Sequence, residues 1–314
     1  MRRYAVRRMA SVVLALLGVS VLTFALGVLA PGEPAEVVLS RSLGQPPSDE
    51  QLEEMRRELG TDRPLVVQYF SWLGGAVRGD FGDSWLRGVR VQDALAERAP
   101  RTAALALAGA GLSLVIGIPI GVLAATRRNS VLDHVSRVGA LFGASLPSFF
   151  IAYVLIYVFA VRFRALPVFG FGSAAHLVLP AVTLALGPAA VLARLTRSAV
   201  LEILGEDYVR TARAKGARAR AVLFHHALRN ALIPVVTVAG LSVGHLLGGS
   251  LIVEWVFAWP GMGDLAVSAI HDRDYPLVQG FVLFAAAVYL VVNLLVDLSY
   301  ARLDPRVRVE GRRA

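Results

Sequence analysis

The sequence contains no cysteine, which excludes disulfide bonds and thiolate metal sites and leaves the redox compartment undetermined. It contains a single lysine, Lys215, and glycine follows it. A phosphate-binding P-loop needs Gly-Lys-Ser or Gly-Lys-Thr, so this chain cannot provide one. Charged residues make up only 18% of the chain, whereas 56% of its 314 residues are hydrophobic. The apolar residues form long blocks between charged segments, which is typical of a membrane protein.

Six apolar blocks are long enough for a helix to cross a bilayer. About 20 apolar residues are needed for this, because the hydrocarbon core holds no water to satisfy backbone groups. The blocks are 12–30, 103–125, 138–161, 177–193, 232–253 and 278–298. We therefore predict an all-α polytopic membrane protein with six transmembrane helices.

Arginine is distributed unevenly among the connections between these blocks. It is concentrated before the first block, between the second and third, between the fourth and fifth, and in the tail. Because Lys and Arg of short loops stay in the cytoplasm, both termini are predicted to be cytoplasmic, in a multi-pass protein of the plasma membrane. This distribution of the net charge of +9 disfavours a nucleic-acid partner.

The predicted orientation divides the chain into three parts. Residues 1–30 are expected to be an N-terminal transmembrane anchor, because their apolar run exceeds the core of a cleaved signal peptide. Residues 31–98 are expected to be an extracytoplasmic helical insertion between the first two transmembrane helices. Residues 99–314 are expected to be the transmembrane core, with a cytoplasmic loop at 196–230.

Two helices are predicted within the insertion. Ser48 and Gln51 form a capping box ahead of an amphipathic helix that stops at Gly60. A second amphipathic helix is predicted from Leu65 to Val77. These helices are equally compatible with a cap packed on the outer membrane surface and with direct substrate contact.

The cytoplasmic loop 196–230 carries the strongest functional signal. Acidic residues begin its first helical segment at Glu206, basic residues end it at Lys215, and Gly216 follows as a natural stop. A second helix is predicted to resume after the glycine and to run to Pro234. Two short helices with exposed charges suit docking to a soluble partner, and ordinary positive-inside charge is the alternative explanation.

The sequence of this loop, DYVRTARAKG followed by HALRNALIP, resembles the signature loop of bacterial ABC importer permeases of the dipeptide, oligopeptide and nickel group. The general importer pattern has Glu-Ala-Ala where this chain has Arg210, Thr211 and Ala212, which leaves Glu206 as the stand-in for the usual acidic residue. Further similar segments follow one another in order along nearly the whole chain. They are VLTFALGVLAPGEPA, RRELGTDRPLVVQYFSWL, GDFGDS, SLPSF, VEWVFAWPGMGDL, RDYPLVQG and LDPRVR.

The resemblance implies a type I ABC importer permease fold and a set of partners. The chain would be the first permease subunit, forming with a related sister permease a heterodimeric passage for peptides or a related small solute. Two ATPase subunits holding ATP and Mg, an extracytoplasmic substrate-binding protein and the lipid bilayer would complete the system. The chain itself would bind no cofactor and catalyse no reaction. Its coupling helix, seated on an ATPase, would comprise Glu206, Asp207, Tyr208, Arg210, Thr211, Ala212, Arg213, Lys215 and Gly216.

The fifth apolar block carries a glycine repeat. Gly240, Gly244 and Gly248 recur every four residues, which allows close approach of another helix. The resemblance makes this face our first choice for the interface with the sister permease, and packing within the chain is an equally good alternative. His245 lies in the same block, and because polar groups inside a membrane are costly, it is expected to line the pathway or to hydrogen-bond within the bundle.

Prolines interrupt two other blocks. Ser145 and Pro147 lie in the third block, where the missing proline N–H favours a kink that could line a cavity. Pro180 and Pro188 are expected to bend the fourth block in the same way. A packing kink without any functional role is the alternative in both cases.

Two other classes of function have weaker support. Ser242 lies in a G-x-S-x-G sequence, but the nucleophile elbow of serine hydrolases needs a strand, a turn and a helix, and this sequence lies within an apolar block. No histidine pair has the spacing of a metal site. An ion-coupled secondary transporter is the main alternative, and the lack of a carboxylate near the middle of a block weakens it.

Overall fold

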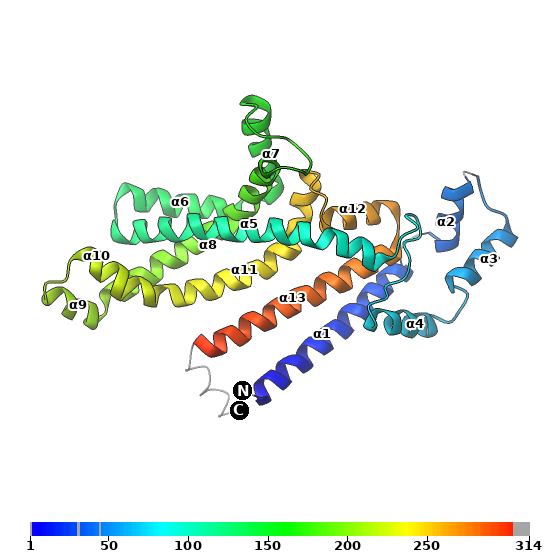
Figure 1. The fold of residues 1–314 in the computed structure, drawn as a ribbon, viewed down its shortest axis with the longest axis horizontal. Coiled ribbons are helices and arrows are strands. Elements are labelled where there is room, and N and C mark those ends of the chain that lie inside the picture. The colour runs from blue at the N-terminus through cyan, green and yellow to red at the C-terminus, as the bar shows by residue number, and fades with distance from the viewer. Residues whose placement is uncertain (1, 30–31, 44, 304–314) are drawn as a thin grey trace. The chain divides into compact units, whose positions relative to one another are not determined.

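The computed structural model describes residues 2–29, 32–43 and 45–303, and these residues form helices, short connections and one isolated β-bridge between Asp83 and Arg90 (Figure 1). The helices are α1 (Arg2–Leu29), α2 (Pro34–Leu43), α3 (Asp49–Leu59), α4 (Leu65–Val77), α5 (Val91–Thr126), α6 (Val131–Ser145), α7 (Ser148–Leu155), the π-helix η1 (Ile156–Arg162), α8 (Ala174–Gly205), α9 (Asp207–Ala214), α10 (Ala219–Ala221), the π-helix η2 (Val222–Ala227), α11 (Leu228–Val256), α12 (Met262–Asp272) and α13 (Tyr275–Leu303).

Five stretches of helix among the described residues are long and apolar enough to cross a membrane. They are Arg8–Leu29, Val91–Thr126, Ala174–Gly205, Ala219–Ser242 and Tyr275–Val296. A sixth crossing is obtained if the bent pair Val131–Ser145 and Ser148–Arg162 counts as one span. The predicted all-α architecture is confirmed, with six spans on that count.

The third predicted span is broken at its proline. Helix α6 ends at Ser145, α7 begins after Pro147, and the helix pair is bent by 108° at this break. Leu146 has an extended backbone (ψ 133°), as expected for a residue that precedes proline. The kink predicted at this site is therefore a complete break of the helix.

The fourth span contains both of its prolines within one helix. Pro180 and Pro188 both lie inside α8, which continues through them as one helix and extends beyond the predicted block at both ends. Both prolines are surrounded by residues packed against neighbouring helices, and this packing holds the helix together where a proline alone would weaken it. The bend expected at these positions therefore stays a prediction, within a helix that is not interrupted.

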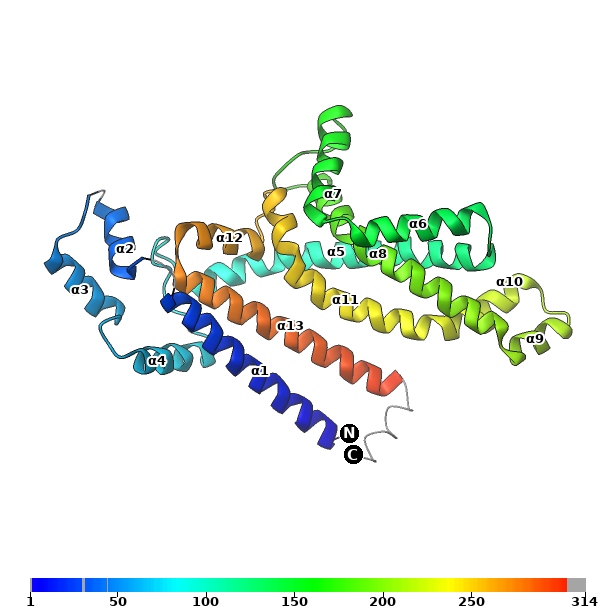
Figure 2. The ribbon, with the colours of Figure 1, turned by 180° about the vertical axis from the view of Figure 1, so that it is seen from behind.

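The chain divides into two compact units, and the first contains residues 101–260 with the later part of α13. Helices α6 and α11 pack along α8, and the part of α5 in this unit also lies against α8 (Figures 1 and 2). A Cβ atom on Gly121 of α5 would lie 2.5 Å from the Ala193 carbonyl oxygen of α8, and one on Gly117 would lie 2.7 Å from that of Ala189. Glycine therefore allows these two helices to touch backbone to backbone.

The second unit contains residues before 101 and residues 261–290, including α1 to α4, α12 and the start of α13. The capping box at α3 is confirmed, since Ser48 N donates to Gln51 Oε1 (2.9 Å) and Gln51 N donates to Ser48 Oγ (3.4 Å). The helix ends at Gly60, whose φ of 67° is the left-handed geometry that glycine adopts readily. Helix α4 has the predicted bounds, whereas α2 and α12 were not predicted.

Candidate functional site

The predicted docking segment forms a short helix of its own at the end of α8. Glu206 has an extended backbone (φ −67°, ψ 147°) that separates α8 from α9. Helix α9 covers Asp207–Ala214, and Gly216, with a φ of 81°, turns the chain away from it. The first of the two predicted helices is therefore confirmed, one residue inside its predicted start.

One face of α9 is anchored and the other is free. Val209 is fully buried, and α9 packs against α8 and η2 through this face. Asn230 Nδ2 donates to the Tyr208 hydroxyl oxygen at 3.0 Å, which ties α9 to α11. Arg210, Arg213 and Lys215 are exposed. The helix therefore presents cationic side chains on an outer face from a fixed position.

The side-chain contacts made within α9 join residues one helix turn apart, and the ion pair among them uses Arg210. Arg210 Nη1 lies 3.3 Å from Asp207 Oδ1, and both side chains are more than three-quarters exposed, so water weakens the pair. Thr211 Oγ1 donates to the Asp207 carbonyl oxygen at 2.9 Å, and Ala212 is half-buried. These contacts stabilise the helix and leave Arg213 and Lys215 exposed on the outer face.

The second predicted helix of the loop does not end at Pro234. Helix α10 begins at Ala219, passes into the π-helix η2 and continues as α11 through Pro234. The loop and the fifth apolar block are therefore one helical element, and the prediction of a separate second helix was wrong. Pro234 is exposed, and α11 continues through it as a helix.

The glycine repeat of α11 is divided between two environments. A Cβ atom on Gly240 would lie 3.3 Å from Val296 Cγ2 of the same chain, and Gly244 is buried. Gly248 is exposed, and a Cβ atom there would meet nothing within 4 Å. The His245 side chain lies outside the described residues. Gly240 thus serves packing within the chain, whereas Gly248 faces outward.

The two candidate pathway residues of the third span lie at the break between α6 and α7. Ser145 and Pro147 are both exposed. Helix α7 packs against α8 and α11, so the break lies beside the helices that carry the docking segment and the glycine repeat.

The hydrolase motif lies within a helix. Ser242 belongs to α11, and its Oγ donates to the Val238 carbonyl oxygen at 2.8 Å. The strand and sharp turn required for a nucleophile elbow are replaced by continuous helix. Within the described part of the chain, no group of three or more metal-ligating side chains comes together.

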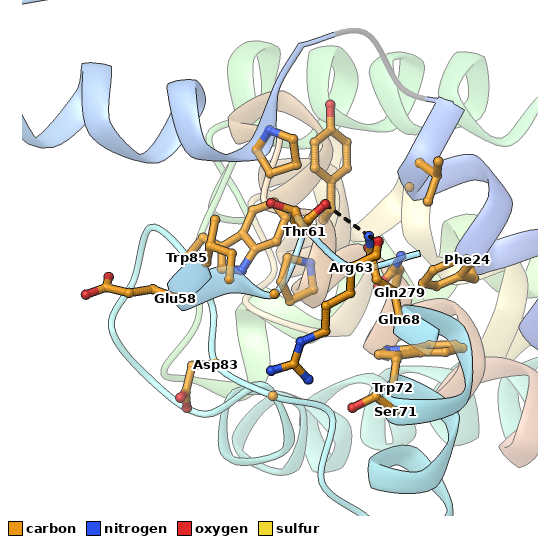
Figure 3. A pocket seen from close by; sticks show the side chains of 18 of the residues that line it. Phe24, Glu58, Thr61, Arg63, Gln68, Ser71, Trp72, Asp83, Trp85 and Gln279 are labelled. Carbon is orange, nitrogen blue, oxygen red and sulfur yellow. Dashed lines mark hydrogen bonds between the residues drawn. The ribbon is translucent and has the colours of Figure 1, made fainter. Parts of the chain in front are cut away.

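The second unit contains a cavity of about 640 Å³ that sequence analysis missed. Aromatic and polar side chains of α1, α4 and the start of α13 surround it, among them Phe24, Trp72 and Gln279 (Figure 3). Arg56 forms an ion pair with Glu33 in its wall, and hydrogen bonds from the guanidinium lower the pKa of that carboxyl. The cavity depends on segments more than 200 residues apart, which no local sequence pattern connects.

Comparison with known proteins gives matches along nearly the whole chain. Residues 117–309 match the family described as the binding-protein-dependent transport system inner membrane component, and residues 1–106 match its N-terminal companion family. The chain is 42% identical over 313 residues to y4tP of Sinorhizobium fredii, named as a peptide ABC transporter permease protein, covering 97% of this chain and 99% of that protein. It is 40% identical over 309 residues to the glutathione transport system permease protein GsiC of Escherichia coli K12, covering 98% and 99%.

Solved structures give the same fold. The chain resembles the MetNI methionine ABC transporter in inward-facing form, with a TM-score of 0.52 and 23% identity over 67% of this chain and 94% of that chain. It also resembles an amino acid ABC transporter crystallised with histidines, with a TM-score of 0.54 and 16% identity over the same shares. The fold is that of type I ABC importer permeases.

Proposed function

This chain belongs to the family of inner membrane components of binding-protein-dependent transport systems, and on that premise we propose that it carries small peptides and is driven through α9 by a separate ATPase. It is a permease subunit of an ABC importer and a multi-pass protein of the inner membrane. It is not an enzyme, since ATP hydrolysis in these transporters belongs to separate subunits.

The observation that supports coupling through α9 is its combination of a buried anchor and an exposed cationic face. A docking element must transmit force, so it has to be held firmly by the rest of the subunit. Val209 and the Tyr208–Asn230 hydrogen bond hold α9 in this way, while Arg213 and Lys215 face outward. These side chains suit acidic residues at the rim of a groove in the ATPase, because complementary charges speed encounter and fix the register.

Peptides are proposed as substrate because the relatives that match almost end to end carry that name. The protein y4tP is named for peptides, and GsiC for glutathione, which is itself a tripeptide. No finding favours the ion-coupled alternative. A related sister permease, two ATPases holding ATP and Mg, and an extracytoplasmic binding protein are the partners that we propose for this chain.

Transport in vesicles tests the proposal as a whole. The complete complex, reconstituted with its binding protein, is expected to take up labelled di- and tripeptides only when ATP is supplied on the side of the ATPases. The matched control replaces ATP by a non-hydrolysable analogue and leaves the ion gradients in place. Accumulation driven by an ion gradient without ATP would replace this proposal by the secondary-transporter alternative.

We propose that both termini and the loop 196–230 lie in the cytoplasm. Residues 31–98 then form an extracytoplasmic segment after the anchor 1–30, and residues 99–314 form the permease core. The arginine-rich connections support this orientation.

Thiol labelling checks the orientation cleanly, because the chain has no cysteine of its own. With Lys215→Cys, a membrane-impermeant maleimide is expected to react in inside-out vesicles and not in intact cells. Asp62→Cys, at an exposed position of the outer segment, is expected to show the reverse. Reaction of the Lys215→Cys protein in intact cells would contradict the orientation and the docking role together.

The glycine face of α11 is proposed as part of the contact with the sister permease and of the pathway, with His245 on the same helix and Ser145 and Pro147 at the break. Only Gly248 is exposed with open space around it, so it is the glycine that another subunit could approach.

Gly248→Leu therefore separates the two explanations of the repeat. A Cβ atom at this exposed position meets nothing within 4 Å, so the subunit is expected to fold normally. The amount of sister permease that co-purifies is expected to fall about tenfold, because overpacking of a close helix contact costs about 1–3 kcal/mol. Gly139→Leu is the matched control, since Gly139 is exposed on α6 with equally open space. Unchanged co-purification of the sister permease with the Gly248→Leu protein would assign the repeat to packing within the chain.

A further inference from the structure

A buried ion pair between Asp133 and Arg197 joins α6 to α8. With the loop 196–230 in the cytoplasm, as proposed, Arg197 lies in the cytoplasmic half of α8. Asp133 is fully buried, and the Arg197 guanidinium donates two hydrogen bonds to it, from Nε to Oδ1 at 2.6 Å and from Nη2 to Oδ2 at 2.9 Å. The Asn129 backbone N–H donates to Oδ2 at 2.9 Å. Arg137 is the third charged group nearby, with its Nε 3.7 Å from Oδ1 and about half of its side chain exposed.

Helix capping explains only part of this arrangement. Ser130 caps α6 through the Asp133 N–H, and the bond from Asn129 to Asp133 closes the same turn. An exposed Asp would serve this purpose equally well. The bidentate pairing with Arg197, 64 residues further along the chain, needs α8 to be in place and has no role in the cap.

The Asp133–Arg197 pair opposes sliding of α6 along α8 where the two side chains meet. Further along the same interface Gly143 lies against Ala190, where no charged side chain is involved. At Asp133, sliding of the helices would break both hydrogen bonds from Arg197 and leave the buried carboxylate with only the half-exposed Arg137 at 3.7 Å and the Asn129 N–H, which costs free energy. The two fork-shaped hydrogen bonds also fix the relative rotation of the helices.

The same level of α8 lies close to the proposed docking helix. Arg197 is eight residues before the end of α8, or roughly 12 Å at 1.5 Å per residue, and no proline lies in between. Helix α9 follows directly and packs back on α8 (Figures 1 and 2). Gly121 of α5 contacts Thr196, the neighbour of Arg197, so three helices meet at this point.

We propose that the Asp133–Arg197 pair is the joint that makes α6 move with α8 when an ATPase displaces α9. The opposite end of α6 is the break before Pro147, so movement of α6 relative to α7 changes the angle at the break. Asp133 and Arg197 are positioning residues in this scheme, and neither needs to touch substrate or ATPase. The inference rests on the proposed docking of an ATPase on α9.

The first test measures coupling in the reconstituted complex with Asp133→Asn and Arg197→Lys. Both variants retain similar volume, and the lysine also keeps the positive charge while losing the two-pronged geometry. We expect each variant to assemble with both ATPases and to hydrolyse ATP. Peptide uptake per ATP is expected to fall about tenfold for Asp133→Asn, because the Arg197 guanidinium then lacks its carboxylate. A smaller reduction is expected for Arg197→Lys. Arg194→Gln, at an exposed position on the same helix, is the matched control and is expected to keep wild-type coupling.

The second test reads the movement directly and does not depend on transport rates. Spin labels on cysteines introduced at Val135 of α6 and Ser198 of α8, both exposed, report the separation of the helices in a chain without other thiols. In the native background we expect the same distance with and without ATP. With Arg197→Lys added, we expect the distance to differ between the two states, because α8 then moves without α6.

The outcomes separate this inference from the proposed function. If the native complex lacks ATP-driven uptake, the proposed function fails at that step. If native uptake is normal and both variants couple ATP to uptake as the native protein does, the proposed role of the Asp133–Arg197 pair is disproved. A native distance that changes on ATP binding also overturns it. Should Asp133→Asn fail to assemble, Arg197→Lys and the distance measurement decide the question.

Discussion

Arg213→Glu in α9 is expected to reduce substrate-stimulated ATP hydrolysis of the reconstituted complex by about tenfold or more. The variant puts a carboxylate where the ATPase groove is proposed to offer acidic residues, and like charges brought together at an interface cost several kcal/mol. The change also places an acidic residue in the last turn of α9, where the helix dipole disfavours it by only about 0.3–1 kcal/mol. The interfacial effect is therefore the larger of the two. Comparison of hydrolysis rates with and without loaded binding protein gives the measurement.

Two further variants assign the cause of that loss. Arg213→Gln removes the charge without adding repulsion, so it is expected to give a smaller reduction. Arg128→Glu makes the same charge change at an exposed site in the connection between α5 and α6, and is expected to leave hydrolysis close to wild type. All three proteins should insert and fold normally, because the replaced side chains are exposed. Normal stimulation with the Arg213→Glu protein would remove α9 from the coupling scheme.

Gly121→Leu in α5 is expected to prevent stable folding of the subunit. Even a Cβ atom at this position would lie 2.5 Å from the Ala193 carbonyl oxygen and 2.6 Å from Thr196 Cβ, and neither atom is at the end of a flexible side chain. The backbones of α5 and α8 would have to separate, which costs at least the upper end of the usual overpacking range, about 3 kcal/mol. Since about 1.4 kcal/mol corresponds to each factor of ten, we expect the ratio of folded to unfolded protein to fall about a hundredfold, and the yield of monodisperse protein in mild detergent to fall with it.

The same helix offers a control for this substitution. Gly111 lies on α5 ten residues earlier and is exposed, and a Cβ atom there would meet no other atom within 4 Å. Gly111→Leu is therefore expected to give a normal yield and a normal thermal transition. A Gly121→Leu protein that melts at the wild-type temperature would show that α5 and α8 are not in close contact.

The local features of the fold could be predicted because they depend on residues close together in the sequence. The capping box at Ser48, the stop at Gly60 and the bounds of α4 each follow from side chains within a few positions of one another. The α9 segment was found for the same reason, since Glu206, Lys215 and Gly216 mark its two ends. The family resemblance then supplied a role for a segment that composition alone left open.

One prediction that failed, the end of a helix at Pro234, concerns a proline. Pro147 breaks its span, whereas Pro180, Pro188 and Pro234 lie within continuous helices. All four lack the same N–H group, so the sequence gives no means of distinguishing them. Exposure does not distinguish them either, since Pro147 at the break and Pro234 within α11 are both exposed.

By itself the sequence determined that this chain is helical, crosses a membrane, lacks a P-loop and carries a charged loop suited to a soluble partner. Those properties depend on composition, on hydrophobic length and on local spacing. Only the tertiary structure decided that Asp133 meets Arg197, that Gly121 lies against α8, and that α1, α4 and α13 enclose a cavity. Each of these joins residues far apart in the chain, and such contacts form because buried surfaces must fit and buried charges must be paired.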